Sequence, residues 1–390
     1  MIPYGKHYLD DDDISTVVGV LRRGPLTQGP MIEALEEAIA EYVGVKYAVA
    51  VSSGTAGLHL AALVAGVGAG DSLVTSPMTF VASANAALYV GANPVFSDID
   101  QNTINMSAEK LKITLQNISN PRAVIPVHFA GLPCNMEEIK KAADDVGAVV
   151  IEDAAHALGS KYPRGQRVGC CAHSLMTVFS FHPVKAISAG EGGMITTNDE
   201  SIYRELLRLR SHGINKLNDQ FQLPEQAKES GLINPWYYEM QELGYNYRIS
   251  DIQCGLALSQ LKKLDKFISR RIELVKNYDK RFAQIENCEP IQQIGRDQVA
   301  HHIYALRINF DTIDISKGQL MSELRTRGVG SQVHYIPVPA QPYYRKLSFN
   351  PEDYPIALEY YRETLTIPLF YELTDEQQEH VITSLELLLK

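Results

Sequence analysis

Short apolar runs alternate with longer amphipathic stretches through the first half of the chain. The apolar runs occupy residues 47–51, 73–75, 94–96, 123–127, 148–151 and 194–197. Short runs of this kind, separated by helical patterns, are typical of buried parallel strands joined by crossover helices. The pattern therefore predicts an α/β fold with a largely parallel sheet that begins near Lys46.

The second half of the chain follows a different pattern, which predicts a smaller domain. An amphipathic stretch from Ile252 to Asp279 predicts one long linking helix. Beyond it we expect strands over 302–308 and 330–334 and a closing helix over 376–389. Because 390 residues exceed what one core normally holds, we expect a large domain over 1–286 and a small α+β domain over 287–390.

One lysine stands among apolar residues just before a glycine-rich turn. Residues 179–185 read FSFHPVK, and residues 189–193 read AGEGG. Burial would lower the pKa of Lys185 and free an amine that can form a Schiff base with a carbonyl. A surface loop explains this segment equally well when it is taken alone. The buried reading indicates pyridoxal phosphate chemistry, which also requires a carboxylate, phosphate ligands and a stacking ring.

The carboxylate candidate is Asp153. Residues 147–151 read as a buried parallel strand that delivers Glu152 and Asp153 at its carboxyl end, where open α/β sheets place their ligands. Asp153 could instead cap the helix that follows or bind magnesium. Neither alternative explains why a strand-end acid and a lone lysine follow one another in the order that pyridoxal enzymes use.

Candidates for the phosphate and the ring face come from two other strand-to-helix junctions. Gly54, Thr55 and Ala56 lie in a small-residue turn before an expected helix over 58–64, whose free amides and one hydroxyl could hold a phosphate. An ordinary capped helix explains the same turn. Ser180 adds a hydroxyl five residues before Lys185. Phe80 could stack on the cofactor ring, although most aromatics are simply core.

Charge and cysteine content exclude several classes of function. The formal charge of −10 disfavours binding to a nucleic-acid backbone, so an anionic ligand must be held by local groups such as Lys185 and Arg248. The five cysteines form no CxxC pair, which argues against a zinc cluster and a disulfide framework. Residues 1–5 lack signal-peptide features and no apolar run could span a bilayer, so we expect a cytoplasmic protein without metal or membrane partners.

Taken together, these motifs resemble the DegT/DnrJ/EryC1/StrS family of sugar-nucleotide aminotransferases over essentially the whole chain. The matching segments are GPLTQGP (24–30), SGTA (53–56), EDAAH (152–156), FSFH (179–182) with Lys185, EGG (191–193) and GYNYR (244–248). The resemblance implies a fold type I pyridoxal 5′-phosphate (PLP) aminotransferase and a homodimer with shared sites.

The resemblance also implies a role for individual residues. Lys185 would bind the cofactor as a Schiff base, Asp153 would hold the pyridine nitrogen, and His156 would lie beside the ring hydroxyl. Thr55, Ala56 and Ser180 would bind the phosphate, with Asn246 reaching the same phosphate from a second subunit. The substrate contacts that it implies are Tyr4, Pro25, Leu26, Thr27, Gly54, Ser180, Asn246, Arg248, His334, Tyr335, Ile336 and Pro337.

Two further segments, SHGINK (211–216) and PWYYEM (235–240), resemble the branch of the family that serves pseudaminic acid biosynthesis. This likeness implies transfer of an amino group from L-glutamate to C4 of a UDP-linked 4-keto-6-deoxy-N-acetylhexosamine, giving UDP-4-amino-4,6-dideoxy-N-acetyl-β-L-altrosamine and 2-oxoglutarate. A perosamine- or bacillosamine-type acceptor, or a PLP-dependent lyase of amino acid metabolism, remains an alternative. A non-catalytic scaffold is disfavoured by the presence of both Lys185 and Asp153.

Overall fold

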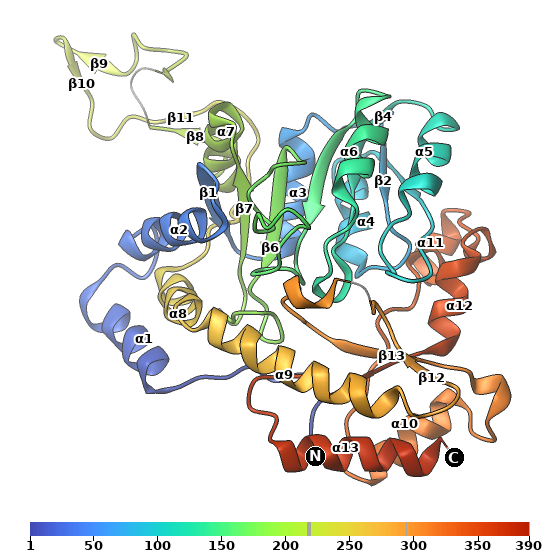
Figure 1. Ribbon diagram of the computed structural model, residues 1–390. Helices are drawn as coiled ribbons and strands as arrows, with labels where there is room; N and C mark the ends of the chain where they lie inside the picture. The colour runs from blue at the N-terminus through green and yellow to red at the C-terminus, as the bar shows by residue number, and fades with distance from the viewer. Residues whose placement is uncertain (217–219, 294, 390) are drawn as a thin grey trace.

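The computed structural model describes residues 1–216, 220–293 and 295–389, and it consists of a large lobe and a small lobe (Figure 1). The large lobe is built on a seven-stranded sheet with the order β1-β7-β6-β5-β4-β2-β3. Its strands are β1 (Tyr47–Val51), β2 (Ser72–Thr75), β3 (Asn93–Phe96), β4 (Pro121–Ile125), β5 (Val149–Asp153), β6 (Met176–Ser180) and β7 (Gly193–Thr197).

The sheet is mixed but mostly parallel. Only β7 runs against its neighbours β1 and β6, whereas the pairs β2–β3, β2–β4, β4–β5 and β5–β6 are parallel. The carboxyl ends of β1, β5 and β6 therefore lie along one edge of the sheet, together with the start of β7. This edge brings together three of the segments that the sequence singled out.

Helices cover both faces of the sheet. They are α1 (Asp11–Arg23), α2 (Pro30–Val43), α3 (Gly54–Val64), α4 (Val81–Tyr89), α5 (Ala108–Gln116), α6 (Met136–Asp144), α7 (Glu200–Arg210), α8 (Asp251–Leu261) and α9 (Leu264–Phe282). Neighbouring residues of one strand point to opposite faces, as in β1, where Ala50 joins the core under α2, α6 and α8 and Val49 joins the core under α3, α4 and α7. Both faces are thus buried, as a parallel sheet requires.

The small lobe is an antiparallel sheet packed against helices. Its strands are β12 (Cys288–Pro290), β13 (Tyr304–Ile308) and β14 (Thr364–Ile367), and its helices are α10 (Lys317–Thr326), α11 (Pro342–Lys346), α12 (Pro355–Glu363) and α13 (Asp375–Leu388). The N-terminal segment also belongs here: Ile2 pairs in parallel with Val329, and both chain ends lie beside this lobe (Figure 1).

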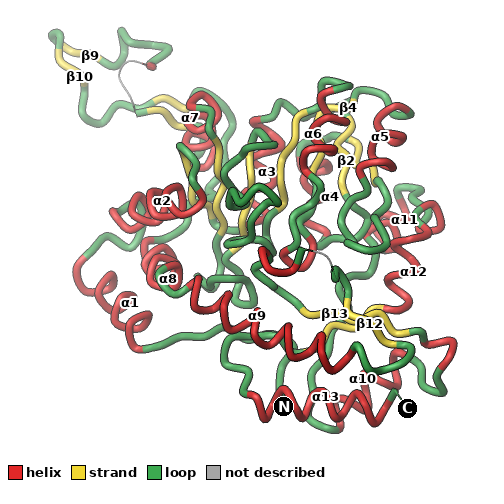
Figure 2. Tube along the Cα trace, viewed as in Figure 1, coloured by secondary structure: helices red, strands yellow, loops and turns green. Residues whose placement is uncertain are grey.

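An arm projects from the large lobe between α7 and α8. Its base is the pair β8 (Ile214–Asn215) and β11 (Glu239–Met240), and its outer part carries β9 (Lys228–Glu229) and β10 (Leu232–Ile233). Figure 2 shows that most of this arm is loop. Across the described ranges, which leave out 217–219, 294 and 390, no helix is long and apolar enough to cross a membrane.

The fold class is confirmed, but several element predictions were wrong. The predicted helix over 252–279 is two helices, α8 and α9, with a break at residues 262–263. The helix expected over 58–64 begins at Gly54, so Thr55 and Ala56 lie in its first turn. No strand forms over 330–334, where only an isolated bridge joins Gln332 to Thr366. The sequence analysis also missed β6, because Thr177 and Ser180 interrupt its apolar pattern.

We expect Gly193→Ala to destabilise the protein, because a Cβ at this position would lie 2.7 Å from the carbonyl carbon of Ser53 and 2.8 Å from the amide nitrogen of Gly54. Both contacts are backbone atoms that cannot move independently, so the free energy of unfolding should fall by about 3 kcal/mol. Gly318→Ala is the control. Nothing lies within 4 Å of its Cβ position in α10, so stability should rise by about 0.5 kcal/mol. Urea unfolding measures both, and equal stability of the two variants would contradict the close approach.

Candidate active site

Asp153 lies at the carboxyl end of β5, and each of its two carboxylate oxygens accepts a hydrogen bond. Ser83, in the first turn of α4, donates to Oδ2 at 2.6 Å, and the backbone N–H of Ala155 donates to Oδ1 at 3.0 Å. The residue is buried, with 5% of its surface exposed. A buried carboxylate at the edge of a parallel sheet is suited to pairing with a cationic ligand group. Ser83 was not predicted, since one serine in an alanine-rich helix carries no distinctive pattern.

Lys185 lies in the loop that follows β6. The loop is turned by a hydrogen bond from the N–H of Lys185 to the carbonyl of His182 at 2.8 Å, and the side chain is half-buried. Burial lowers the pKa of Lys185 to about 8, while the negative charge of Asp153 acts in the opposite direction. The buried reading of this lysine, rather than the surface-loop reading, therefore describes its surroundings.

His156 lies beside these two groups and has one unpaired nitrogen. The Tyr335 hydroxyl lies 3.1 Å from Nε2, whereas Nδ1 is buried without a partner in the part of the chain that is described. The His302 ring packs against the His156 ring with 4.3 Å between centroids. Burial lowers the pKa of His156 well below its ordinary value, and the positive charges of Lys185 and His334 lower it further. His156 is therefore neutral at pH 7.

The first turn of α3 forms an anion cradle next to Ser180. Ser53 caps this helix by accepting the Ala56 N–H at 3.0 Å. A Cβ on Gly54 would lie 3.0 Å from Cβ of Ser180, so glycine lets the helix start approach that hydroxyl. Backbone N–H groups at a helix N-terminus, a serine hydroxyl and the half-buried Thr55 are the donors that a phosphate prefers.

Phe80 is unusually exposed for an aromatic residue at this edge. It stands at the N-cap of α4, 59% of its surface is exposed, and its ring centroid lies 6.4 Å from that of Tyr335. Contacts within the chain therefore leave much of this ring free. An open aromatic face at the mouth of a polar site is suited to stacking against a flat ligand.

These residues fit PLP on three separate observations. The unpaired Nδ1 of His156 offers a partner for the ring oxygen, Asp153 offers a carboxylate for the pyridine nitrogen, and the close approach of Gly54 to Ser180 offers a phosphate cradle. Lys185 provides the amine with which the aldehyde group of PLP can form a Schiff base.

A buried network behind Asp153 was not predicted. Glu152 is completely buried and accepts hydrogen bonds from Ser174 (2.5 Å), Tyr162 (2.5 Å) and Thr177 (3.1 Å), and its Oε2 lies 2.8 Å from Nε2 of His128. Burial opposes ionisation of Glu152, yet these donors hold its pKa below the ordinary value. The Cys134 N–H donates to Nδ1 of His128 at 3.1 Å, so the His128 proton lies on Nε2 and points at Glu152.

Of the predicted substrate residues, one group lies near Lys185. The Tyr4 ring packs against His334 with 5.4 Å between centroids, and His334 is bonded to Thr366 at 2.9 Å. Burial lowers the pKa of His334 to about 4, and the charge of Lys185 contributes. Ile336 is 44% exposed, and Pro337 is buried where the chain turns back to the large lobe.

A second group of predicted residues lies on another surface. Pro25, Leu26 and Thr27 are exposed, and their loop is tied to the start of α8 by the bridge between Thr27 and Ser250. Asn246 is also exposed and pairs with Ser211, while Arg248 is half-buried two residues further on. Among the described residues, this group makes no hydrogen bond or ion pair with Lys185.

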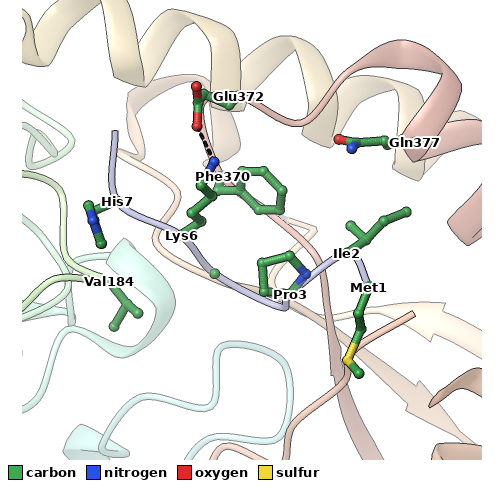
Figure 3. Close-up of a pocket in the computed structure, with 10 residues that line it drawn as sticks. Met1, Ile2, Pro3, Lys6, His7, Val184, Phe370, Glu372 and Gln377 are labelled. Carbon is green, nitrogen blue, oxygen red and sulfur yellow. Dashed lines mark hydrogen bonds and ion pairs between the residues drawn. The ribbon is translucent and has the colours of Figure 1, made fainter. Parts of the chain in front are cut away.

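A cavity of about 620 Å³ lies on the far side of the Lys185 loop (Figure 3). It is bordered by the N-terminal segment, by Val184 and by Phe370, and the ion pair between Lys6 and Glu372 at 2.6 Å crosses one wall. None of the residues that fit PLP lines it. It is therefore a neighbour of the candidate site and not the cofactor pocket itself.

A sheet of this topology with a lysine loop opposite a strand-end aspartate defines a fold type I, PLP-dependent aminotransferase. The chain belongs to the DegT/DnrJ/EryC1/StrS aminotransferase family, which it matches over residues 7–386. It is a PLP-dependent sugar aminotransferase, as this family and its solved members indicate.

Similar proteins cover the whole chain. The spore coat polysaccharide biosynthesis protein SpsC of Bacillus subtilis is 36% identical over 393 residues, covering 100% of this chain and 97% of SpsC. PseC of Helicobacter pylori, an aminotransferase of pseudaminic acid biosynthesis, is 29% identical, has a TM-score of 0.88 and covers 100% of this chain and 99% of PseC. Spr1654 of Streptococcus pneumoniae in its PLP form is 28% identical, with a TM-score of 0.88 and coverage of 99% and 98%.

We expect Lys185 to react with limiting acetic anhydride in cofactor-free protein with a pH midpoint near 8, because its pKa is lowered to about 8. With this lowered pKa, half of the Lys185 side chains are neutral and reactive at about pH 8, and about a tenth are neutral at pH 7. An ordinary lysine loses its proton only near pH 10.4. Mass spectrometry of the Lys185 peptide measures this midpoint.

Asp153→Asn should move the midpoint to a lower pH, since Asp153 favours the charged lysine. A lysine model peptide in the same tube controls for the reagent. A Lys185 midpoint equal to that of the peptide would contradict burial of the amine.

Proposed function

We propose that this protein transfers an amino group from L-glutamate to C4 of a UDP-linked 4-keto-6-deoxy-N-acetylhexosamine. The products would be UDP-4-amino-4,6-dideoxy-N-acetyl-β-L-altrosamine and 2-oxoglutarate, as in pseudaminic acid biosynthesis. The observation that carries the proposal is a half-buried Lys185 whose pKa is lowered to about 8 and on which the negative charge of Asp153 acts. The cytoplasm, where thiols are kept reduced, is part of the proposal.

In this mechanism the large lobe holds the cofactor from three sides. Thr55, Ala56 and Ser180 bind the phosphate through hydroxyl and N–H groups at the start of α3. Asp153 keeps the pyridine nitrogen protonated, and Ser83 and the Ala155 N–H keep the carboxylate in place. Phe80 covers one ring face. When bound, PLP supplies the electron sink for negative charge at the reacting carbon.

Lys185 performs the proton transfers. As a neutral amine it removes the proton from Cα of glutamate, and in the second half of the cycle it delivers a proton to C4 of the sugar. Its pKa near 8 suits both directions at neutral pH, because the amine and ammonium forms are then close in free energy. Burial increases the fraction of neutral Lys185 amine, and the negative charge of Asp153 limits how far the pKa of Lys185 falls.

The acceptor sugar would lie at the mouth of the site. Tyr4, His334 and Tyr335 line the small-lobe side, and the exposed Ile336 extends that wall. We assign the nucleotide to the surface that carries Thr27, Asn246 and Arg248, supplied by a second subunit. The exposure of Asn246 supports this assignment.

The similarity to PseC, 29% identical over the full chain, supports an acceptor of the pseudaminic acid type. SpsC shares a higher 36% identity, and its name concerns a spore coat polysaccharide. That similarity favours a second candidate, the same reaction on another nucleotide-linked 4-keto-6-deoxy sugar. The chemistry at Lys185 is common to both candidates.

The first test is the visible absorption of PLP-loaded protein during each half-reaction. We expect glutamate to abolish the long-wavelength band and the UDP-4-keto-6-deoxy sugar to restore it, because glutamate would donate the amino group and the sugar would accept it. Lys185→Arg keeps a cation but should show neither change. Return of the band only with a different keto sugar would favour the second candidate, and no band in loaded protein would refute the proposal.

The shared site is tested by mixing two inactive variants, Lys185→Ala and Asn246→Ala. If Asn246 acts in the partner's site, half of randomly paired dimers hold one complete site, and the mixture should recover about a quarter of wild-type activity. The control is Asn117→Ala, at the C-cap of α5, which should remain active alone. If the mixture stays inactive after subunit exchange is verified, Asn246 does not act across the interface.

A further inference from the structure

Tyr335 connects the small lobe to His156, a histidine beside Lys185. Its hydroxyl lies 3.1 Å from Nε2 of His156, and the two residues are 179 positions apart in the sequence. The chain around Tyr335 is tied to the small lobe through the bridge between Gln332 and Thr366. The phenol is thus a hydrogen-bonding group of the small lobe that reaches the large-lobe site.

The phenol is held in place from several directions. The Tyr335 N–H is bonded to Sδ of Met78 at 3.2 Å, and the Phe129 ring meets the Tyr335 ring edge-on at 6.2 Å. Phe129 also packs edge-on against His156, again at 6.2 Å. Tyr335 and His156 therefore both pack against Phe129, which restricts the rotation of either ring.

The two nitrogens of His156 are not equivalent. Nε2 has the Tyr335 hydroxyl, whereas Nδ1 is buried and unpaired in the described part of the chain. Leaving a buried donor or acceptor without a partner is costly, so Nδ1 needs a ligand atom. The groups that face this ring are Lys185, His334, His302 and Tyr335, with Asp153 three residues before it.

The neutral His156 ring carries one N–H proton, on either Nδ1 or Nε2. The position of this proton decides whether Nδ1 is a hydrogen-bond donor or an acceptor. Burial raises the pKa of Tyr335, so the phenol stays protonated and its O–H can donate a hydrogen bond to Nε2 of His156. The proton of His156 then lies on Nδ1, which becomes a donor. A donor suits the ring oxygen of PLP, which carries negative charge.

We propose that Tyr335 is a positioning residue that holds His156 in the Nδ1–H form and so aims this N–H at the ring oxygen of the cofactor. His302, packed at 4.3 Å, closes the space into which the ring would otherwise turn. The inference rests on the proposed function, since it assumes the cofactor beside His156. Its consequence is that the small lobe sets a donor inside the large-lobe site without touching the cofactor.

The test compares Tyr335→Phe with Tyr360→Phe. Both changes remove one hydroxyl from the same aromatic cluster, but within the described residues the Tyr360 hydroxyl makes no hydrogen bond to His156. The first measurement is nitrogen NMR of histidine-labelled, cofactor-free protein, with the His156 signal assigned from a His156→Gln sample. We expect the Nδ1–H form in wild type and in Tyr360→Phe, and a mixture with the Nε2–H form in Tyr335→Phe.

The second measurement is the pH midpoint of the visible band after loading with PLP. With PLP bound through Lys185, loss of the Nδ1–H donor of His156 would leave the negative ring oxygen less well stabilised, so the proton that titrates beside it would be held to higher pH. The midpoint should rise by up to about one unit in Tyr335→Phe and stay unchanged in Tyr360→Phe. We also expect kcat to fall about five-fold with little change in KM for glutamate.

An unchanged tautomer in folded Tyr335→Phe would overturn the inference, and so would a changed tautomer with an unchanged midpoint. The NMR result needs no cofactor, so it stands even if the proposed function fails. Normal half-reactions together with an unchanged tautomer would reject the role of Tyr335 and keep the aminotransferase. If Tyr335→Phe does not fold, Met78→Leu, which removes the acceptor of the Tyr335 N–H and so loosens the position of the phenol, should shift the tautomer in the same direction by a smaller amount, and an unchanged tautomer there would also count against the inference.

Discussion

The candidate site depends on the burial of one carboxylate, Glu152, beneath the sheet edge. An isolated buried carboxylate would take up a proton, but four surrounding side chains satisfy its two oxygens. His128 acts on both neighbours: its ring bonds to Glu152, and its backbone N–H donates to the Asp153 carbonyl at 3.1 Å. Because successive side chains of a strand point to opposite faces, fixing Glu152 on one face fixes Asp153 on the other.

Around that fixed point the site consists of groups whose ordinary charges are suppressed. Burial lowers the pKa of His156, His302 and His334, so these three histidines carry little charge at pH 7, and it lowers the pKa of Lys185 to about 8. A cluster of full positive charges would repel itself in a medium of low dielectric. At Lys185, the negative charge of Asp153 opposes the lowering of the pKa by burial. The balance between burial and one negative charge therefore sets the basicity of the lysine.

Sequence reasoning reached the parts of this arrangement that local patterns encode. The strand before Asp153 and the apolar surroundings of Lys185 are visible in a few consecutive residues, and so is the alternation that predicts the α/β fold. The break between α8 and α9 was missed because the amphipathic pattern continues through it. Ser83, His128 and the contact between Tyr335 and His156 could not be predicted, since each depends on residues far apart in sequence.

The first residues of the chain are built into the last part of it. The Ile2 amide bonds to the carbonyl of Gly328 at 2.8 Å, the Tyr4 carbonyl accepts the N–H of Leu369 at 3.0 Å, and the Lys6 ammonium pairs with Glu372. During synthesis these residues have no partners until residues 328–372 have been made. Contacts of such long sequence separation form late, because the loop they close is long. The small lobe therefore completes its sheet region late in folding, and with it the wall of the site formed by Tyr4 and His334.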